Sequence, residues 1–363
     1  MQMIKLALID NGIPYHMRNN RNQRIVHKSF LASKCDPSEY KDDKSFHGAV
    51  CVGIITSICS DIELWDLNVT DSAGTTQITV LLEALEWCIQ NKIKLIHMSL
   101  GTINYFDIKP LWIQIKRLLD ADAIIVAAYH NRNIKTYPAA YPGVFGVRQD
   151  RYGLLGNGQI LFQEQKGYNI ENSIIANFSW NGIVNQANSY AAPVVTGHIA
   201  TYLNRKPTAG FDDVMDFLAT HKSDYPDILE NVIRDKTNIE IPVIAGIDLD
   251  YEEMIQLKVM FSQNGYYAIN LQKNPLDENV IPLEYYDDSN ESLNDILYTV
   301  YIAYEPDIIL LNQEEEIFES SKASDIDMYI VRKNNMYELY AEDRIGITYN
   351  IEDIYELVCQ YFA

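Results

Sequence analysis

The sequence predicts a doubly wound α/β fold with a mostly parallel sheet, followed by a second, smaller α/β domain. Short apolar runs alternate with stretches in which apolar residues recur at helical spacing, and this alternation restarts after a polar segment at residues 222–240. The charge of the chain changes at about the same point. We therefore expect two domains, residues 1–225 and residues 226–363.

The first domain shows strand and helix patterns in turn. We expect strands at residues 4–9, 62–67, 94–98, 123–128 and 143–147, and helices at residues 47–58, 76–91, 108–120, 189–203 and 211–220. This order is typical of a parallel sheet that is covered by helices on both faces. In such sheets the functional site lies at the carboxyl ends of the strands.

The second domain repeats the alternation on a smaller scale. We expect strands at residues 241–247, 266–271 and 308–311, helices at 252–263 and 292–304, a hairpin formed by 328–331 and 337–340, and a closing helix at 351–362. The sequence has no internal repeat, and its low-complexity content is limited to the acidic run Glu314–Glu316.

Charge is distributed unevenly along the chain. Residues 1–225 hold 21 Lys and Arg against 21 Asp and Glu, whereas residues 226–363 hold 8 against 29, which accounts for the whole net charge of −21. The acidic part has two interpretations: a solvated surface that aids solubility, or a surface that attracts a basic peptide or partner. Neither part has the basic face that nucleic acid binding needs, so we expect no nucleic acid partner.

The sequence favours a cytoplasmic protein with no membrane partner. No stretch approaches the roughly 18 uncharged apolar residues of a membrane-spanning helix. The apolar run at the N-terminus is short, is broken by Lys5 and is followed by no small-residue cleavage site, so it does not match a signal peptide. The five cysteines lack metal-ligand spacing and fit reduced thiols better than a disulfide framework.

Two short segments of the first domain carry an acid and a histidine. Asp10 ends the first strand in Ala-Leu-Ile-Asp-Asn-Gly, where a carboxylate can orient a histidine; the other interpretation is a simple turn. His47 opens the next helix in His-Gly-Ala-Val-Cys-Val-Gly, and Gly48 removes side-chain bulk beside the imidazole. The alternative for His47 is a surface histidine near a helix start.

Two further segments end buried strands in polar loops. Ser99, Leu100 and Gly101 follow the strand at 94–98, and Asn131 follows the strand at 123–128. Strand tips that carry Ser-Leu-Gly and Asn would form a cleft with backbone groups facing inward. A side-chain amide in that cleft can donate a hydrogen bond to a developing oxyanion.

A serine stands at the start of an apolar helix. Ser189 lies in Ala-Asn-Ser-Tyr-Ala-Ala-Pro-Val-Val-Thr-Gly, and we expect Pro193 to lie within or next to the first helical turn, where proline is tolerated. The free N–H groups and positive dipole of a helix start favour an anion beside Ser189. The alternative is a serine that only caps the helix.

Together these segments resemble the subtilisin-like (S8) serine peptidases. Asp10, His47 and Ser189 follow the order acid, histidine, serine of the subtilisin triad. The other matches are to the Ser-Leu-Gly, Ala-Ala-Gly-Asn, Tyr-Pro-Ala-x-Tyr-Pro and Gly-Thr-Ser-Met-Ala-x-Pro-x-Val-x-Gly segments of the family, and they lie at Ser99–Gly101, Ala127–Asn131, Tyr137–Pro142 and Ala187–Gly197. The resemblance covers roughly residues 4–220.

The resemblance implies a subtilisin-like fold and a serine endopeptidase. Asp10, His47 and Ser189 would be catalytic and Asn131 would help to bind the oxyanion. Ser99, Leu100 and Gly101 would pair with an extended peptide substrate. Such a reaction requires no metal or organic cofactor, and no compact Asp-rich loop in the first domain points to a structural calcium.

Several residues depart from the family segments. Ala49 and Val50 stand where the family has Thr-His, and Ala187 and Asn188 precede Ser189 in place of Gly-Thr. His130 replaces the glycine before the oxyanion asparagine. The stretch between residues 179 and 189 is short, so the loops near the cleft are trimmed. These departures affect the expected substrate range and turnover more than the chemistry.

The layout also resembles small subtilisin-like proteins that accompany bacterial peptide-maturation systems. We therefore expect narrow specificity for a precursor or leader peptide. The short stretch ahead of Asp10 leaves no room for a propeptide, and narrow specificity would then serve as the restraint. The second domain is a candidate for substrate recruitment or for forming a homo-oligomer; the alternative is a structural appendage that covers an apolar face.

Two rival functions follow from other features. The altered residues around His47 and Ser189 are consistent with a catalytically inactive subtilisin-like protein that binds peptides or regulates a partner. A nucleotide-binding α/β protein is disfavoured, because no Gly-rich phosphate loop follows an early strand.

Overall fold

The structure of the protein is a computed structural model. It describes residues 3–14, 25–31, 47–71, 74–131, 136–163, 173–180, 183–184, 187–221, 239–273, 280–283, 293–313, 326–341 and 343–362. The chain divides into two compact units, residues 1–232 and 233–363. The division falls within residues 222–238, outside the described residues. The predicted domain boundary at 225/226 also lies there and stays a prediction, and the acidic run Glu314–Glu316 likewise lies outside the described residues.

The first unit is built around an eight-stranded sheet. Its strands are β1 (Ile4–Asp10), β2 (Ile25–Ser29), β3 (Ile62–Asn68), β4 (Leu95–Met98), β5 (Ile124–Ala128), β6 (Val144–Gln149), β7 (Ile160–Gln163) and β8 (Ser173–Ala176). They lie in the order β2-β3-β1-β4-β5-β6-β8-β7, and every neighbouring pair is parallel except β7 and β8. A separate antiparallel pair consists of β9 (Ser179–Trp180) and β10 (Ile183–Val184).

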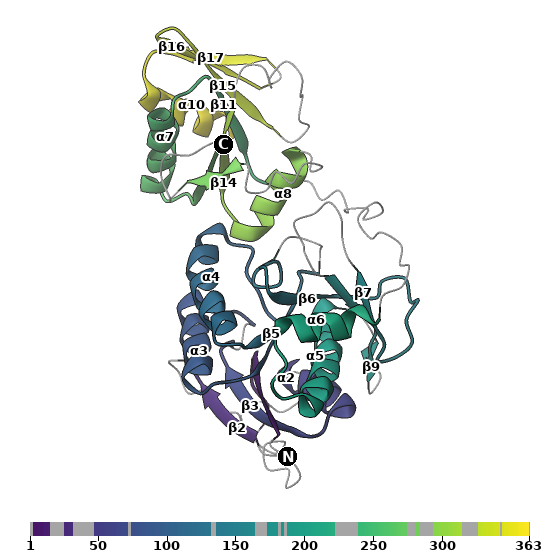
Figure 1. Cartoon of the computed structure of the whole chain (residues 1–363). Coiled ribbons are helices and arrows are strands. Elements are labelled where there is room, and N and C mark those ends of the chain that lie inside the picture. The colour runs from purple at the N-terminus through teal and green to yellow at the C-terminus, as the bar shows by residue number, and fades with distance from the viewer. Residues whose placement is uncertain are drawn as a thin grey trace. The chain divides into compact units, whose positions relative to one another are not determined.

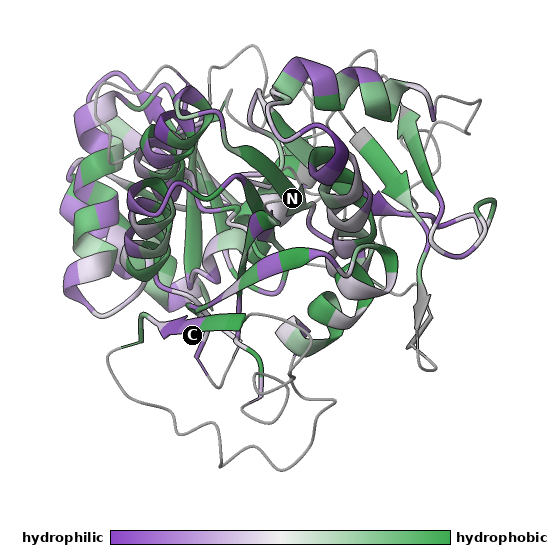
Figure 2. Ribbon diagram, turned by 60° about the horizontal axis from the view of Figure 1, so that its bottom comes forward, coloured by the Kyte–Doolittle hydropathy of each residue, from purple (hydrophilic) through white to green (hydrophobic). Residues whose placement is uncertain are grey.

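Helices cover both faces of this sheet. They are α2 (His47–Ile58), α3 (Ile78–Gln90), α4 (Tyr105–Asp120), α5 (Asn188–Arg205) and α6 (Phe211–Ala219). Helices α3 and α4 pack together on one face, and α2 packs against α5 on the other (Figure 1). Every residue of the central strand β5 is buried, and the strands in the middle of the unit are hydrophobic whereas the helices carry hydrophilic stripes (Figure 2). The predicted doubly wound, mostly parallel α/β fold is confirmed.

Most predicted elements of the first unit are present within a few residues of their expected bounds. Helix α4 begins three residues before the predicted start at 108, because Asn104 caps it by accepting a hydrogen bond from the backbone N–H of Phe106 at 2.9 Å. The prediction missed β2, β7, β8 and the two-residue strands β9 and β10. Strands β2 and β7 lie at the two edges of the sheet, and β2 has no buried residue.

The second unit is a smaller α/β structure with its own sheet. Its elements are β11 (Val243–Ile247), α7 (Tyr251–Gln263), β12 (Ala268–Gln272), β13 (Ile281–Pro282), α8 (Leu293–Tyr304), β14 (Ile308–Gln313), β15 (Met328–Lys333), β16 (Met336–Tyr340), β17 (Arg344–Thr348) and α10 (Ile351–Phe362). The strands lie in the order β13-β12-β14-β11-β15-β16-β17, parallel as far as β15 and antiparallel beyond it. The predicted hairpin is β15–β16, and β17 extends it by a strand that was not predicted.

A glycine in β6 allows the aromatic ring of a neighbouring residue to pack close to the sheet. A Cβ added at Gly146 would overlap the ring of Tyr129 and would lie 2.7 Å from the carbonyl oxygen of Ala139. Tyr129 is 4% exposed and follows β5 directly, so it belongs to the segment that leads into the loop of Asn131. The packing at Gly146 therefore supports the end of β5.

We expect Gly146→Ala to destabilise the first unit. Overpacking a buried position of this kind costs about 1–3 kcal/mol of unfolding free energy. The measurement is the denaturant midpoint, with Gly156→Ala as the control, because a Cβ at Gly156 would meet only the flexible side chain of Gln159. Equal midpoints for the two variants would show that the end of β5 has room for a methyl group.

Candidate active site

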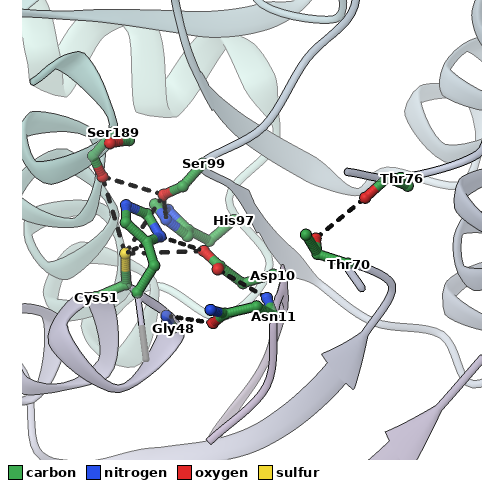
Figure 3. Close-up of polar contacts among 10 residues, drawn as sticks. Asp10, Asn11, Gly48, Cys51, Thr70, Thr76, His97, Ser99 and Ser189 are labelled. Atoms are coloured by element: carbon green, nitrogen blue, oxygen red, sulfur yellow. Dashed lines mark hydrogen bonds and ion pairs between the residues drawn. The ribbon is translucent and has the colours of Figure 1, made fainter. Parts of the chain in front are cut away.

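The acid and the histidine of the predicted triad are in direct contact. Asp10 ends β1, is 5% exposed, and its Oδ2 lies 2.8 Å from Nδ1 of His47, the first residue of α2 (Figure 3). The backbone N–H of Gly48 donates to the side-chain oxygen of Asn11 at 3.0 Å. A Cβ at Gly48 would lie 2.8 Å from the carbonyl oxygen of Gly12. Glycine at this position therefore lets the start of α2 lie against the turn that follows β1.

A buried thiol lies beneath the same pair. Cys51 Sγ is 3.6 Å from His47 Nδ1 and 3.9 Å from Asp10 Oδ2. Burial raises the pKa of the Cys51 thiol, which keeps it neutral. Burial lowers the pKa of His47, whereas Cys51 and Asp10 raise it, and the net direction is upward. With the thiol neutral, the Asp10 carboxylate is the negative charge that favours the protonated imidazole.

Ser189 lies at the beginning of α5, beside the imidazole. The residue that caps this helix is Ala187, so the alternative in which Ser189 is only an N-cap is wrong. The Tyr190 ring stacks on the His47 ring, with centroids 4.9 Å apart and planes inclined by 28°. Among the described residues, His47 Nε2 is buried and has no hydrogen-bond partner, so no hydrogen bond joins it to the Ser189 hydroxyl. Catalytic hydrogen bonds are often long or poorly aligned in free enzymes and tighten only when substrate binds.

The position of Pro193, next to the first turn of α5, changes the bonding of Ser189. Pro193 is the sixth residue of α5, in the second turn and not in the first. Proline has no N–H, so the carbonyl of Ser189, four residues earlier, lacks its helical donor. The Ser99 hydroxyl replaces that donor at 3.1 Å. The proline is tolerated because a side chain from β4's end satisfies the carbonyl it leaves open.

The amide of Asn131 is held by the segment that carries the nucleophile. Its Oδ1 accepts a hydrogen bond from the backbone N–H of Asn188 at 2.8 Å. The amide's other atom, Nδ2, has no hydrogen bond among the described residues, which leaves it available as a donor. The hydrogen bond from Asn188 thus fixes the Asn131 amide beside the start of α5.

Asn188 itself is fully buried and ties the ends of β5 and β6 to the start of α5. Its Nδ2 donates to the carbonyl oxygens of Tyr129 and His130 at 3.1 and 2.9 Å, and its Oδ1 accepts from the backbone N–H of Gln149 at 2.9 Å. At residues 187–188, where the family has Gly-Thr, the Asn188 side chain therefore anchors the segment that leads into α5.

The predicted substrate segment leaves β4 in the same region. The Ser99 side chain points inward, toward the carbonyl of Ser189, whereas Gly101 is exposed. A Cβ at Gly101 would lie 2.7 Å from the carbonyl oxygen of Tyr137, and Thr102 forms an antiparallel bridge with Tyr137. The structure thus brings all seven predicted site residues to the carboxyl ends of β1, β4 and β5 and the starts of α2 and α5.

The sequence prediction missed three residues that contact the predicted site residues. Cys51 and Tyr190 were read only as parts of the helix patterns, and His97 as part of a buried strand. Cys51 is one turn after His47, and Tyr190 directly follows Ser189, so their positions carried a signal. In the part of the chain that the structure describes, Asp10, His47 and Cys51 also form a group of potential metal ligands whose atoms lie within 4.8 Å of one another.

Comparisons with known proteins identify similar sequences and structures. No protein-family model matches the sequence. The chain is 31% identical over 156 residues to the minor extracellular protease Epr of Bacillus subtilis, which covers 40% of this chain and 23% of that protein. It is 27% identical over 227 residues to subtilisin E of Bacillus subtilis, which covers 56% of each. The chain is subtilisin-like.

The subtilisin-like chain spans about a quarter and just over half of the length of these two relatives. A crystal structure of a cold-adapted subtilisin-like serine proteinase aligns at 18% identity with a TM-score of 0.47, over 60% of this chain and 81% of that one. Among the described residues, none of the helices combines the length and apolar character needed to traverse a bilayer.

We expect Asp10→Asn to slow reaction of Ser189 with a phosphonylating probe and to move its pH dependence. A neutral imidazole is the base, so the rate rises with pH through the pKa of His47, which burial lowers and the Asp10 carboxylate raises. Loss of the carboxylate lowers that pKa, shifts the rise toward acid, and reduces the plateau by on the order of 10⁴-fold. The measurement is the labelling rate over roughly pH 5–10.

The control is Asp66→Asn. Asp66 is also fully buried, and its Oδ2 lies 2.6 Å from Nδ1 of His27 on the neighbouring strand. The same isosteric change there is expected to leave the pH profile in place. Identical profiles for wild type and Asp10→Asn would contradict the assignment of Asp10.

Proposed function

We propose that the protein is a serine endopeptidase that uses Asp10, His47 and Ser189 as a triad. The observation that carries the proposal is the 2.8 Å contact between the buried Asp10 carboxylate and His47 Nδ1, at the start of a helix that packs against the helix of Ser189. An aspartate at Nδ1 leaves Nε2 as the basic nitrogen, which is the nitrogen that takes a proton from a serine in such triads.

In this mechanism the Ser189 oxygen attacks the scissile carbonyl carbon while its proton passes to His47 Nε2. The tetrahedral oxyanion accepts hydrogen bonds from Asn131 Nδ2 and the Ser189 backbone N–H, at the positive end of the α5 dipole. His47 then gives the proton to the leaving amine and the C–N bond breaks. Water, activated by the same imidazole, hydrolyses the acyl-enzyme and restores the Ser189 hydroxyl.

Labelling with a fluorophosphonate probe tests the proposal. We expect one equivalent of label on wild type and none on Ser189→Ala, measured by intact mass. Ser60→Ala is the control, since Ser60 is an exposed serine whose hydroxyl bonds, among the described residues, only to Asp61. Folded wild type that takes no label would favour the inactive, peptide-binding alternative, for which the unpartnered His47 Nε2 and the stacked Tyr190 are the supporting observations.

We further propose that the substrate is a precursor or leader peptide with basic character, processed with narrow specificity in the cytoplasm. The support is the charge of residues 226–363, which hold 29 acidic against 8 basic side chains and attract a basic chain over a distance of about one Debye length, ~8–10 Å. Absence of a disulfide among the described cysteines is consistent with a reducing compartment.

A salt series on two matched peptides tests this substrate class. We expect a Lys- and Arg-rich peptide to be cleaved faster than the same peptide with Glu at those positions, and the difference to shrink as ionic strength rises. The measurement is kcat/KM by mass spectrometry, with casein as a nonspecific substrate. Equal rates on both peptides, or rapid digestion of casein, would contradict the narrow, charge-guided specificity and leave the triad unaffected.

A further inference from the structure

A buried histidine outside the proposed triad connects β4 to the helix of the nucleophile. His97 is 0% exposed, and both ring nitrogens have partners: Nδ1 lies 2.8 Å from the Thr196 hydroxyl and Nε2 lies 2.6 Å from the Ser99 hydroxyl. Thr196 and Ser189 both belong to α5. No step of the proposed reaction uses His97, so its contacts need another explanation.

The explanation begins with the carbonyl of Ser189. Because Pro193 offers no N–H, that carbonyl depends on donors from outside the helix. Ser99 Oγ lies 3.1 Å away, and Cys51 Sγ, a weak donor, lies 3.8 Å away. The Ser99 hydroxyl is therefore the donor that satisfies it.

The proton count on Ser99 then fixes the tautomer of His97. A hydroxyl has one proton, so if Ser99 donates to the Ser189 carbonyl, it must accept from His97 Nε2. Burial lowers the pKa of His97 to about 3, a change that Asp10 opposes and His47 reinforces, and the ring is therefore neutral. With the proton on Nε2, Nδ1 is an acceptor and receives the hydroxyl proton of Thr196.

The distances also allow the opposite direction of these hydrogen bonds, which would have a different outcome. The Thr196 hydroxyl lies 3.1 Å from the carbonyl of Ala192. If Thr196 donated there, His97 would carry its proton on Nδ1, Ser99 would donate to Nε2, and the Ser189 carbonyl would keep only the Cys51 thiol. The direction of these hydrogen bonds thus decides whether the Ser189 carbonyl accepts a hydrogen bond from the Ser99 hydroxyl.

We propose that His97 is a positioning residue which, as the Nε2–H tautomer, directs the Ser99 hydroxyl to the carbonyl of Ser189 and so fixes the nucleophile segment for attack. The proposal rests on the proposed peptidase function. His97 touches no substrate atom, and its effect passes through Ser99 alone.

A double-mutant cycle on labelling rates tests this path. His97→Phe and Ser99→Ala are each expected to slow fluorophosphonate labelling by about 10- to 100-fold, as small misplacements of a reacting group do. Because His97 acts through Ser99, the double variant is expected to be no slower than Ser99→Ala. Rates that multiply in the double variant would overturn the proposal.

Two further variants separate positioning from general packing. His97→Gln retains one acceptor and one donor, and we expect it to recover part of the labelling rate that His97→Phe loses. His198→Phe is the control, since His198 lies on α5 and its ring, among the described residues, forms a hydrogen bond only with the carbonyl of Gly158, at 2.8 Å. A Gln variant no faster than a folded Phe variant would overturn the role of the hydrogen bonds.

The tautomer is measured independently of activity by ¹⁵N NMR of the histidine rings. A protonated Nε2 on His97 is expected, and a protonated Nδ1 would overturn the proposal even if the protein is labelled. If wild type takes no label, the peptidase function fails and the positioning role of His97 in that reaction fails with it. The NMR result would still report the direction of the hydrogen bonds through His97. The two failures are therefore distinguishable.

Discussion

The contact between Asp10 and His47 depends on how closely a helix can approach the end of a parallel strand. β1 lies between β3 and β4, so the Asp10 carboxylate at its end stands in the interior of the sheet and not on an edge strand. Helix α2 reaches this point because Gly48 presents only a hydrogen to the Gly12 carbonyl. A single methyl group there would push the imidazole outward, and the hydrogen bond to Asp10 would be the first contact to be lost.

The positions of the site residues were predictable because each ends a strand or begins a helix. Parallel strands bring such ends together whatever their separation in sequence. Each local pattern also allowed a simple turn, a surface histidine or a helix cap, and the resemblance to subtilisin-like peptidases selected Asp10, His47 and Ser189. The bonds between them were not predictable. His97 and Thr196 are 99 residues apart and meet through side-chain rotamers that no periodicity encodes. The turn occupied by Pro193 also depended on where α5 begins, which the pattern placed one residue late.

The same reasoning explains which parts of the fold escaped prediction. Buried strands and the apolar faces of helices follow the chemistry of the core, and most of these elements were predicted in both units, although the buried strands β7 and β8 were not. Strands β2 and β17 lie at sheet edges and are mostly exposed or half-buried, so their sequences carry no apolar run. A strand with one face in solvent forms because it pairs with a neighbouring strand from elsewhere in the chain. Its own composition does not predict it.

The stacking of Tyr190 on His47 has a spectroscopic consequence. With centroids 4.9 Å apart and planes inclined by 28°, the imidazole protons lie over the face of an aromatic ring, where its circulating electrons shield them. Their resonances should therefore stand apart from those of the other six histidines of the chain. The protein therefore carries an intrinsic reporter at His47. Any ligand that separates the two rings would return these signals to their ordinary frequencies, without a dye or a substrate analogue.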